Sequence, residues 1–329
     1  MIDIQLLRKN PEELAQRLAA RGPGAFDARQ FEQFEGTRKQ LQTAVEQAQA
    51  SRNRIAKDIG LAKAKGHDVA ELLQEGERLK ALLDRSEQQL TKLQSAYQDF
   101  LERIPNIPHE SVPVGASAEH NREERRWGEP RAFGFPVKDH VDVGEALGGL
   151  DFATGAKIAG SRFVVMRGPI ARLHRAIAQL MLDVHTREHG YTEVYVPYMV
   201  TGECANGVSS LAKFKGDLFK IEDRDLYLIP TAEYPVTNFV RDEIVPRESL
   251  PLKFVCHSPC FRSEAGSAGK DTRGMIRNHQ FDKVELVMIA HPDKSYELLE
   301  ALTAHAEAVL RKLELPYRVV SLSTGDIGF

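Results

Sequence analysis

The sequence predicts an α+β fold, in which a long N-terminal antiparallel coiled-coil hairpin precedes an antiparallel sheet with flanking helices. Apolar residues recur at alternating spacings of three and four over residues 31–62 and again over 69–104, which is typical of two helices packed along one seam. Later in the chain, residues 254–288 alternate like two strands that bracket a polar, glycine-rich loop. These two patterns need different cores and therefore predict at least two domains.

Composition sets the class of protein. The chain has 329 residues, of which 42% are hydrophobic and 28% charged, as in a globular protein with a sizeable core. Its formal net charge of -3 means that any nucleic-acid contact must come from local basic patches. The first residues lack the apolar region of a signal peptide, and we find no run of about eighteen apolar residues. We therefore expect a cytoplasmic protein without a membrane span.

The helical part begins with an amphipathic segment, Asp3 to Ala20, that we expect to form one short helix, followed by a Gly-Pro-Gly break. A seam then runs through the first long helix at Phe31, Phe34, Arg38, Leu41, Val45, Ala48, Arg52, Ile55, Ile59 and Ala62. It returns after a turn at residues 65–68, through Val69, Leu72, Gly76, Leu79, Leu83, Ser86, Leu90, Leu93, Tyr97, Phe100 and Ile104. The hairpin should extend roughly 50 Å at the α-helical rise of about 1.5 Å per residue.

The end of this arm is basic. Arg54, Lys57, Lys63 and Lys65 approach the turn with Asp58 as the opposing acid. Such a cluster is typical of a surface that contacts a phosphate backbone, although basic residues on a coiled coil can also be an ordinary solvated surface. The cations at Arg38 and Arg52, within the seam, are expected to fix register or extend outward rather than to bind RNA.

Domain boundaries follow from the prolines and charges after the arm. We expect residues 1–104 to form the arm, 105–136 a proline-rich, charged linker, and 137–329 the second domain. Within that domain we expect a strand at 162–166 and a helix at 170–189. A further strand at 191–196 should end at Pro197.

Thr231 and Glu233 lie in the segment Leu-Ile-Pro-Thr-Ala-Glu, where a strand is expected to lead into a turn. Two residues apart, they would offer a hydroxyl and a carboxylate on one side to a small polar ligand. The alternative interpretation is a helix cap or turn, the commoner use of such residues.

The segment 254–288 is the strongest chemical signal. Alternation would place Arg262 and Glu264 on one face of the first strand, and Phe281, Lys283 and Glu285 together on the second. An arginine can fork onto a phosphate, an aromatic ring can stack on a base, and an acid can accept from an amine. This combination predicts a nucleotide site, with a solvated hairpin as the alternative.

The three cysteines are Cys204, Cys256 and Cys260, too few for a disulfide framework. Cys256 and Cys260, with His257 between them, suggest zinc, but a further ligand at suitable spacing is missing. Because the strand period places both cysteines on one packed face, we interpret them as buried thiols and assign no metal-ligating side chain.

Residues 260–264 (Cys-Phe-Arg-Ser-Glu), the loop, and 277–285 (Arg-Asn-His-Gln-Phe-Asp-Lys-Val-Glu) resemble motif 2 of class II aminoacyl-tRNA synthetases, in the form found in seryl-tRNA synthetases. The Thr-Ala-Glu tripeptide at 231–233 is similar to a signature of the same family. The helix, strand and proline over 170–197 resemble motif 1, which forms the homodimer interface in that class. The resemblance covers the whole chain.

This resemblance implies ATP-dependent activation of serine to seryl-adenylate and its transfer to tRNA(Ser), with ATP and Mg²⁺ required. It gives Arg262 the catalytic role at the α-phosphate. It implies ATP contacts at Arg262, Ser263, Glu264 and Phe281, and serine contacts at Thr231, Ala232, Glu233 and Glu285. It also implies tRNA contacts at Arg54, Lys57, Lys63, Lys65, Lys270 and Arg273. Which acid takes the serine ammonium and which its hydroxyl stays open.

The family continues beyond the position of Phe329, where its motif 3 would supply a further ATP-binding arginine and an acidic metal ligand. We therefore expect a C-terminally truncated chain, either a fragment or a natural relative, that is inactive alone. A non-catalytic tRNA-binding or dimerising relative is the second hypothesis. Retention of Arg262, Glu264, Phe281 and Glu285 together favours the ligase, because a protein without catalysis does not need all of them.

Overall fold

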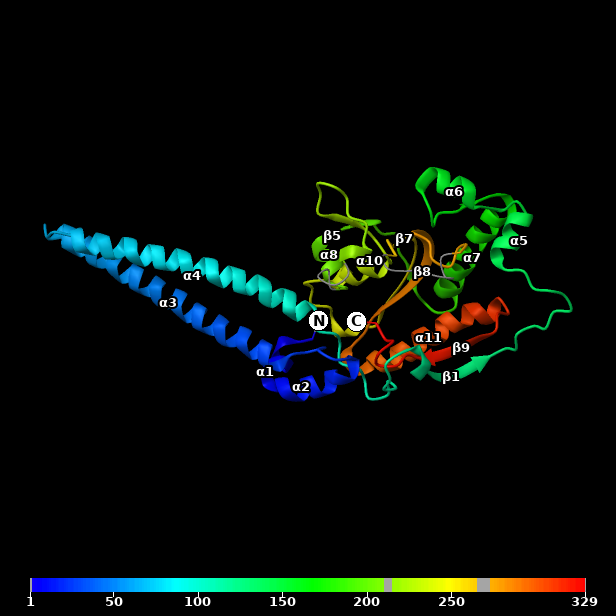
Figure 1. Ribbon diagram of the computed structural model, residues 1–329, viewed down its shortest axis with the longest axis horizontal. Coiled ribbons are helices and arrows are strands. Elements are labelled where there is room, and N and C mark those ends of the chain that lie inside the picture. Colours follow the sequence, from blue (N-terminus) through cyan, green and yellow to red (C-terminus); the bar gives the residue numbers. More distant parts are fainter. Residues whose placement is uncertain (1, 210–214, 265–272, 329) are drawn as a thin grey trace. The chain divides into compact units, whose positions relative to one another are not determined.

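The structure is a computed structural model that describes residues 2–209, 215–264 and 273–328. It divides into two compact units, Met1–Arg122 with Val320–Phe329, and Glu123–Val319 (Figure 1). The fold is α+β, as expected. The boundaries at 104 and 136 stay predictions.

The first unit begins with two helices rather than the single one expected over residues 3–20. Helix α1 covers Ile4–Lys9 and α2 covers Pro11–Leu18. The break lies at Asn10, whose side chain accepts a hydrogen bond from the Glu13 N–H and so caps α2. Pro11 suits the first position of a helix because it has no N–H to donate there.

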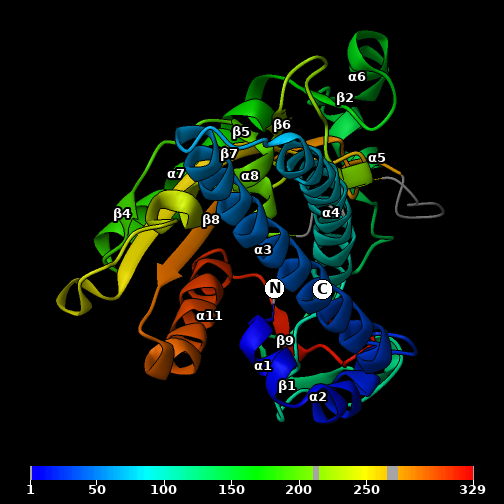
Figure 2. The ribbon, with the colours of Figure 1, turned by 90° about the vertical axis from the view of Figure 1, so that its left-hand side faces the viewer.

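The long hairpin is confirmed. Helix α3 covers Ala28–Ala64 and α4 covers Ala70–Glu102, and the two lie side by side in Figures 1 and 2. Asp27 caps α3 by accepting from the N–H of Gln30. Every position of the expected seam is buried or half-buried. Gly76 faces Ile55 across the seam, where an added Cβ would lie 3.8 Å from the isoleucine methyl group.

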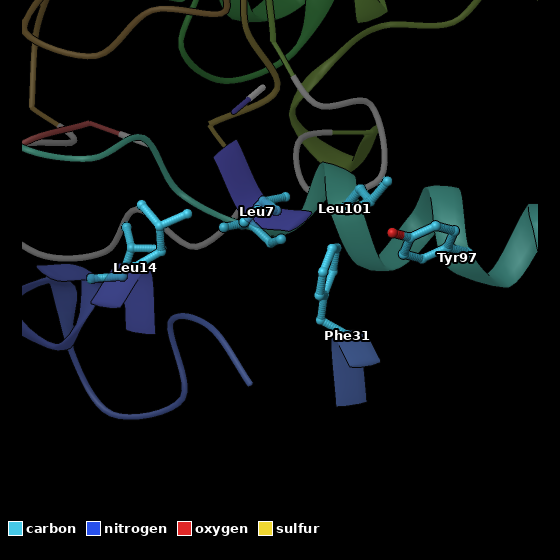
Figure 3. Close-up of a cluster of buried hydrophobic side chains, with 7 residues drawn as sticks. Leu7, Leu14, Phe31, Tyr97 and Leu101 are labelled. Carbon is cyan, nitrogen blue, oxygen red and sulfur yellow. The ribbon is translucent and has the colours of Figure 1, made fainter. Parts of the chain in front are cut away.

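The base of the arm is built on one apolar cluster. Its buried members are Leu7, Leu14, Leu18, Phe31, Tyr97, Leu101 and Ile104 (Figure 3). Full burial of a leucine or phenylalanine side chain contributes roughly 1.5–3 kcal/mol. The cluster thus joins α1 and α2 to the start of α3 and the end of α4.

An ion cluster lies beside this core. Glu35 accepts from Arg8 Nε at 2.8 Å, from Arg38 Nε at 3.1 Å and from the Tyr97 hydroxyl at 2.9 Å. Although burial alone would raise the pKa of Glu35, these donors lower it to about 2. Arg38, which the seam pattern placed between the helices, is therefore held by an acid of its own helix.

The second unit is built around the strand order β4-β7-β8. Strands β7 (Leu252–Phe261) and β8 (Gln280–Ile289) pair antiparallel, as expected. Strand β4 covers Thr192–Glu193, which is shorter than the expected 191–196, and runs parallel to β7, so this sheet is mixed. Helix α7 (Gly168–Arg187) packs against β7 and β8 and matches the predicted helix within two residues at each end.

The charged run that we expected within the linker contains a strand. β1 (Arg122–Trp127) pairs with β9 (Tyr317–Ser321), and the Trp127 and Tyr317 rings stack with centroids 5.8 Å apart. Arg125 Nε donates to Glu307 Oε1 at 3.0 Å, and this bond is the main cause that lowers the pKa of Glu307 to about 2. Arg125 of β1 thus has its partner on α11 (Ser295–Lys312).

Shorter elements complete this unit. The strand expected at 162–166 is limited to Val165–Met166, because Arg162 has a left-handed backbone with φ of 64°. The remaining helices and strands are α5 (His140–Ala146), β2 (Leu150–Asp151), α6 (Phe152–Ala159), β3 (Val165–Met166), β5 (Met199–Thr201), α8 (Gly202–Asn206), β6 (Leu226–Leu228) and α10 (Glu233–Thr237). Among the described residues, the 3-10 turns of this unit are η3 (Lys215–Asp217), η4 (Asn238–Val240), η5 (Arg247–Ser249) and η7 (Pro292–Lys294). The first unit has η1 (Ala19–Arg21) and η2 (Ala118–His120).

Candidate active site

One face of the β7–β8 hairpin carries the polar groups of the site. Phe281, Lys283 and Glu285 share this face of β8, as their alternation predicts. The register places them opposite three buried residues of β7, in the pairs Cys260 with Phe281, Ser258 with Lys283, and Cys256 with Glu285. Because the β7 side chains are small, the longer β8 side chains can extend over them.

The segment after β6 brings Thr231 onto this face. The Thr231 hydroxyl donates to Glu285 Oε2 at 2.8 Å and accepts from the backbone N–H of Glu233 at 3.1 Å. It also accepts from Lys283 Nζ at 2.8 Å. Thr231 is therefore both a local turn-forming residue and a member of the site, so the two interpretations left open by the sequence are compatible. Ala232 is fully buried beside Val236 and holds its neighbours in place.

The site is acidic at this end. Burial raises the pKa of Glu233, the Glu285 carboxylate raises it further, and Lys283 opposes both. Lys283 forms an ion pair with Glu285, and their side chains are 32% and 19% exposed. Two carboxylates and a hydroxyl around one cation form a place where an ammonium or a hydroxyl group can bind.

Arg262 and Phe281 form the other end of the site. The Arg262 guanidinium carbon lies 5.2 Å from the centre of the Phe281 ring, and its Nε donates to the Pro230 carbonyl at 3.4 Å. Strand β7 ends at Phe261, so Arg262 lies just beyond it and reaches the ring from the strand end. A cation beside an aromatic face suits a phosphate next to a planar base.

The prediction that Arg262 and Glu264 alternate on one strand face is wrong, because both follow the strand and Glu264 has φ of 49°. The Glu264 carboxylate pairs with Arg277 Nη1 at 3.0 Å, and its carbonyl accepts from Arg162 at 3.1 Å. Ser263 donates its hydroxyl to the Gly216 carbonyl at 2.7 Å. Our sequence reasoning missed Arg162, whose position was read as a strand, and no local pattern marks it.

The remaining predicted contacts lie elsewhere. Arg54, Lys57, Lys63 and Lys65 are exposed near the end of the arm. Arg273 pairs with Asp139 and, at 2.9 Å, with Asp142 on α5, so its guanidinium is already partly used. Lys270 lies outside the described residues.

The cysteines are buried thiols, as the strand period predicts for Cys256 and Cys260. Burial raises the pKa of Cys256 to about 11 and also raises the pKa of Cys260 and Cys204. Over residues 2–209, 215–264 and 273–328, His, Cys, Asp and Glu side chains do not gather in groups of three or more suited to a metal ion. Nor does that part of the chain contain a helix long and apolar enough to span a bilayer.

Two family profiles match the chain. The seryl-tRNA synthetase N-terminal domain matches residues 1–108, which include the arm. The tRNA synthetase class II core domain (G, H, P, S and T) matches residues 215–329, which include β7 and β8.

Whole proteins give the same result. The serine–tRNA ligase of Thiobacillus denitrificans is 59% identical over 332 aligned residues, an alignment that covers 100% of this chain and 78% of the relative. The crystal structure of seryl-tRNA synthetase from Pyrococcus horikoshii complexed with ATP is 37% identical, with a TM-score of 0.83 over 100% of this chain and 78% of that one. The cytoplasmic serine–tRNA ligase from Naegleria fowleri in complex with AMP is 26% identical, with a TM-score of 0.77 over 100% of this chain and 79% of that one.

Proposed function

Because the chain belongs to the seryl-tRNA synthetase family, we infer that it is a serine–tRNA ligase, which activates serine with ATP and transfers the seryl group to tRNA(Ser). The observation that carries this inference is the 59% sequence identity to a serine–tRNA ligase, in an alignment that covers the entire chain. The arrangement of Thr231, Arg262 and Glu285 around one hairpin face is compatible with that chemistry.

For the serine pocket, we propose that Glu233, Glu285 and Thr231 receive the ammonium and hydroxyl groups, with Ala232 in support. Burial raises the pKa of Glu233, which makes this carboxyl a strong partner for a donor group. Arg262 neutralises the carboxylate of serine and the α-phosphate, which would otherwise repel each other. A serine carboxylate oxygen then attacks the α-phosphorus and pyrophosphate leaves. The terminal ribose hydroxyl of tRNA next attacks the acyl carbon, and AMP leaves.

This mechanism uses positioning and charge neutralisation rather than a protein nucleophile. We propose that Phe281 stacks on adenine and that Ser263 and Glu264 contact ATP around it, supported by the position of Arg262 at the Phe281 ring. Mg²⁺, when bound, would neutralise the triphosphate.

Further proposals concern partners. The exposed basic end of α3 is proposed to bind the tRNA backbone, together with Lys270 and Arg273. Helix α7 is proposed to form a homodimer interface, in line with the motif 1 resemblance. We also propose a cytoplasmic location.

Pyrophosphate exchange in the full-length gene product tests the assignment. Serine should support exchange far better than alanine, because alanine leaves a buried acceptor at Glu233 or Glu285 without its hydrogen bond. Discrimination of about a hundredfold or more is expected for a site that bonds the substrate hydroxyl. Threonine, whose extra methyl group tests the size of the pocket, completes the series. Equal exchange rates with serine and alanine would contradict the assignment as a serine–tRNA ligase.

The same assay can be applied to residues 1–329 alone. The chain spans 78% of the length of its relative from Thiobacillus denitrificans, and the resemblance places motif 3 in the remainder. We propose that these residues give no measurable exchange, since loss of one electrostatic element costs about a hundredfold to a thousandfold. Exchange at the full-length rate would contradict this proposal and leave the family assignment intact.

A further inference from the structure

The hydrogen-bonding capacity of the Thr231 hydroxyl is fully used. A hydroxyl has one hydrogen to donate and two lone pairs to accept with. The hydrogen goes to Glu285 Oε2, one lone pair accepts the Glu233 N–H, and the other accepts Lys283 Nζ. A new donor can therefore reach Thr231 only if one of the present donors leaves.

Of the two donors, Lys283 is the one that can leave. The Glu233 N–H is part of the backbone at the first residue of α10 and is fixed by the turn. Lys283 ends in a flexible four-carbon stem, and its side chain is 32% exposed. Its Nζ contacts both Thr231 and Glu285, which are two of the three residues proposed above to receive the ammonium and hydroxyl groups of serine.

We propose that Lys283 is a positioning residue whose ammonium occupies the ammonium subsite of the empty serine pocket and is displaced by the ammonium of the substrate. The inference rests on the proposed function and adds a competition step to serine binding. Lys283 keeps Thr231 and Glu285 in their binding geometry until serine arrives.

The charges of the pocket explain why such a cation is needed. Glu233 and Glu285 are close enough for the Glu285 charge to raise the pKa of Glu233, and Lys283 lowers it. Without a cation these acids would repel each other or take up a proton. Arg262 is engaged at the other end of the site, with the Phe281 ring and the Pro230 carbonyl.

Competition of this kind lowers the affinity of every ligand that binds through its ammonium group, so a ligand without further contacts binds only weakly. Exchange of one ammonium for another gains little free energy, so a ligand must gain affinity from its other groups. Serine offers a hydroxyl and a carboxylate as well. A simple amino alcohol such as ethanolamine lacks the carboxylate, so we expect it to bind only weakly while Lys283 occupies the ammonium subsite.

The test uses Lys283→Met in the full-length protein, which keeps the length of the stem and removes its charge. The KM for serine should fall about fivefold, equivalent to about 1 kcal/mol, while kcat changes less than twofold. The competitive inhibition constant of ethanolamine against serine should also be lower in the variant than in the wild type, by a similar factor. Lys253→Met, on β7 but directed to the His189 carbonyl, is the matched control and should match the wild type in both measurements.

Two results would overturn the proposal. A higher KM or a large loss of kcat in Lys283→Met would mean that Lys283 contacts the substrate or the transition state. Unchanged ethanolamine inhibition would mean that it does not occupy the ammonium subsite. If the wild-type protein itself fails to activate serine, the proposed function fails instead, so the two failures are distinguishable.

Discussion

At the scale of single residues, small side chains on β7 leave space for the longer side chains of the candidate site on β8. Cys256, Ser258 and Cys260 are at most 1% exposed and lie opposite the polar residues of the site. A thiol in such a position is compact and stays protonated, because burial in apolar surroundings disfavours the thiolate. Cys256 and Cys260 therefore have a structural role, as small buried side chains of the core.

All three cysteines should be unreactive in the native protein. Since burial raises the pKa of each thiol, and that of Cys256 to about 11, little thiolate exists at pH 7.5. Titration of the 329 residues with a disulfide reagent should detect no thiol before denaturation and three after it. The exposed control Ser95→Cys should add one thiol that reacts at once. A native thiol that reacts as fast as the control would contradict the prediction.

The position of a site residue can be predicted from the sequence only where local secondary structure determines it. Alternation correctly placed Phe281, Lys283 and Glu285 together because a strand has a fixed period. The same rule failed at Arg262 and Glu264, since a positive φ at a glutamate is not visible in a hydrophobic pattern. The contact of Thr231 with Lys283 joins segments far apart in the chain, so no spacing could reveal it.

At the scale of elements, α7 and α11 meet through a group of histidines. His185 Nδ1 lies 3.0 Å from His189 Nδ1, the His189 and His305 rings stack at 4.1 Å, and the Tyr191 hydroxyl lies 2.9 Å from His305 Nδ1. The charged neighbours are Glu188, which pairs with Lys312, and Lys253. Burial lowers the pKa of all three histidines, and that of His185 to about 4.

Residues 123–319 should therefore lose stability in mild acid. Between pH 6.5 and about 4 the unfolded chain protonates His185 while the folded chain does not, so the free energy of unfolding falls as pH falls. The loss from His185 is on the order of 2–3 kcal/mol once pH reaches the folded pKa. Thermal unfolding at several pH values between 7.5 and 5 measures it.

Variants identify the source of this pH dependence. His185→Gln cannot take up a proton and should flatten the change in melting temperature with pH, whatever its effect on stability at pH 7.5. His67→Asn, at the exposed end of the arm, should keep the wild-type slope. An undiminished slope in His185→Gln would assign the effect to other groups.

Helices and strands with a clear hydrophobic periodicity can be predicted from the sequence. Elements that depend on partners far away in the sequence cannot. The α3–α4 seam extends over many turns and was read correctly. Strand β1 was taken for linker because its sequence is almost entirely charged, and its partners on α11 and β9 lie nearly two hundred residues later. The break at Asn10–Pro11 has a local signal, a capping asparagine followed by a proline, but amphipathic spacing alone does not detect it.

At the scale of the whole molecule, the arm and the active site should separate functionally. Removal of residues 31–104 from the full-length protein, with the ends bridged, should leave adenylation nearly intact and abolish aminoacylation. Serine, ATP and their contacts are proposed to lie within residues 123–319, whereas most of the proposed tRNA contacts, Arg54, Lys57, Lys63 and Lys65, lie at the far end of the arm. Pyrophosphate exchange and tRNA charging on the same preparation measure the two activities.

Charge reversal sharpens this test. Replacement of Arg54, Lys57, Lys63 and Lys65 by glutamate should weaken tRNA binding and reduce its salt dependence by about one unit of log–log slope for each lost phosphate contact. Lys39→Glu with Lys92→Glu, exposed but nearer the base of the arm, provides a control of the same charge type. Equal slopes in both variants and the wild type would mean that the basic end is an ordinary solvated surface.

The Glu35 cluster also links α3 to α1 and α4 at the base of the arm, within the first unit. Helix α3 has 37 residues, and its far end at Ala64 lies about 44 Å along the helix from Glu35, at about 1.5 Å per residue. A tilt of about 5° at Glu35 would move the far end by about 4 Å, more than the length of a hydrogen bond. Arg8 and Tyr97 bond Glu35 from α1 and α4, so these two elements restrain α3 at this point, whereas the bond from Arg38 lies within α3 itself. A small change in the contacts of this carboxylate would therefore be magnified at the far end of the arm.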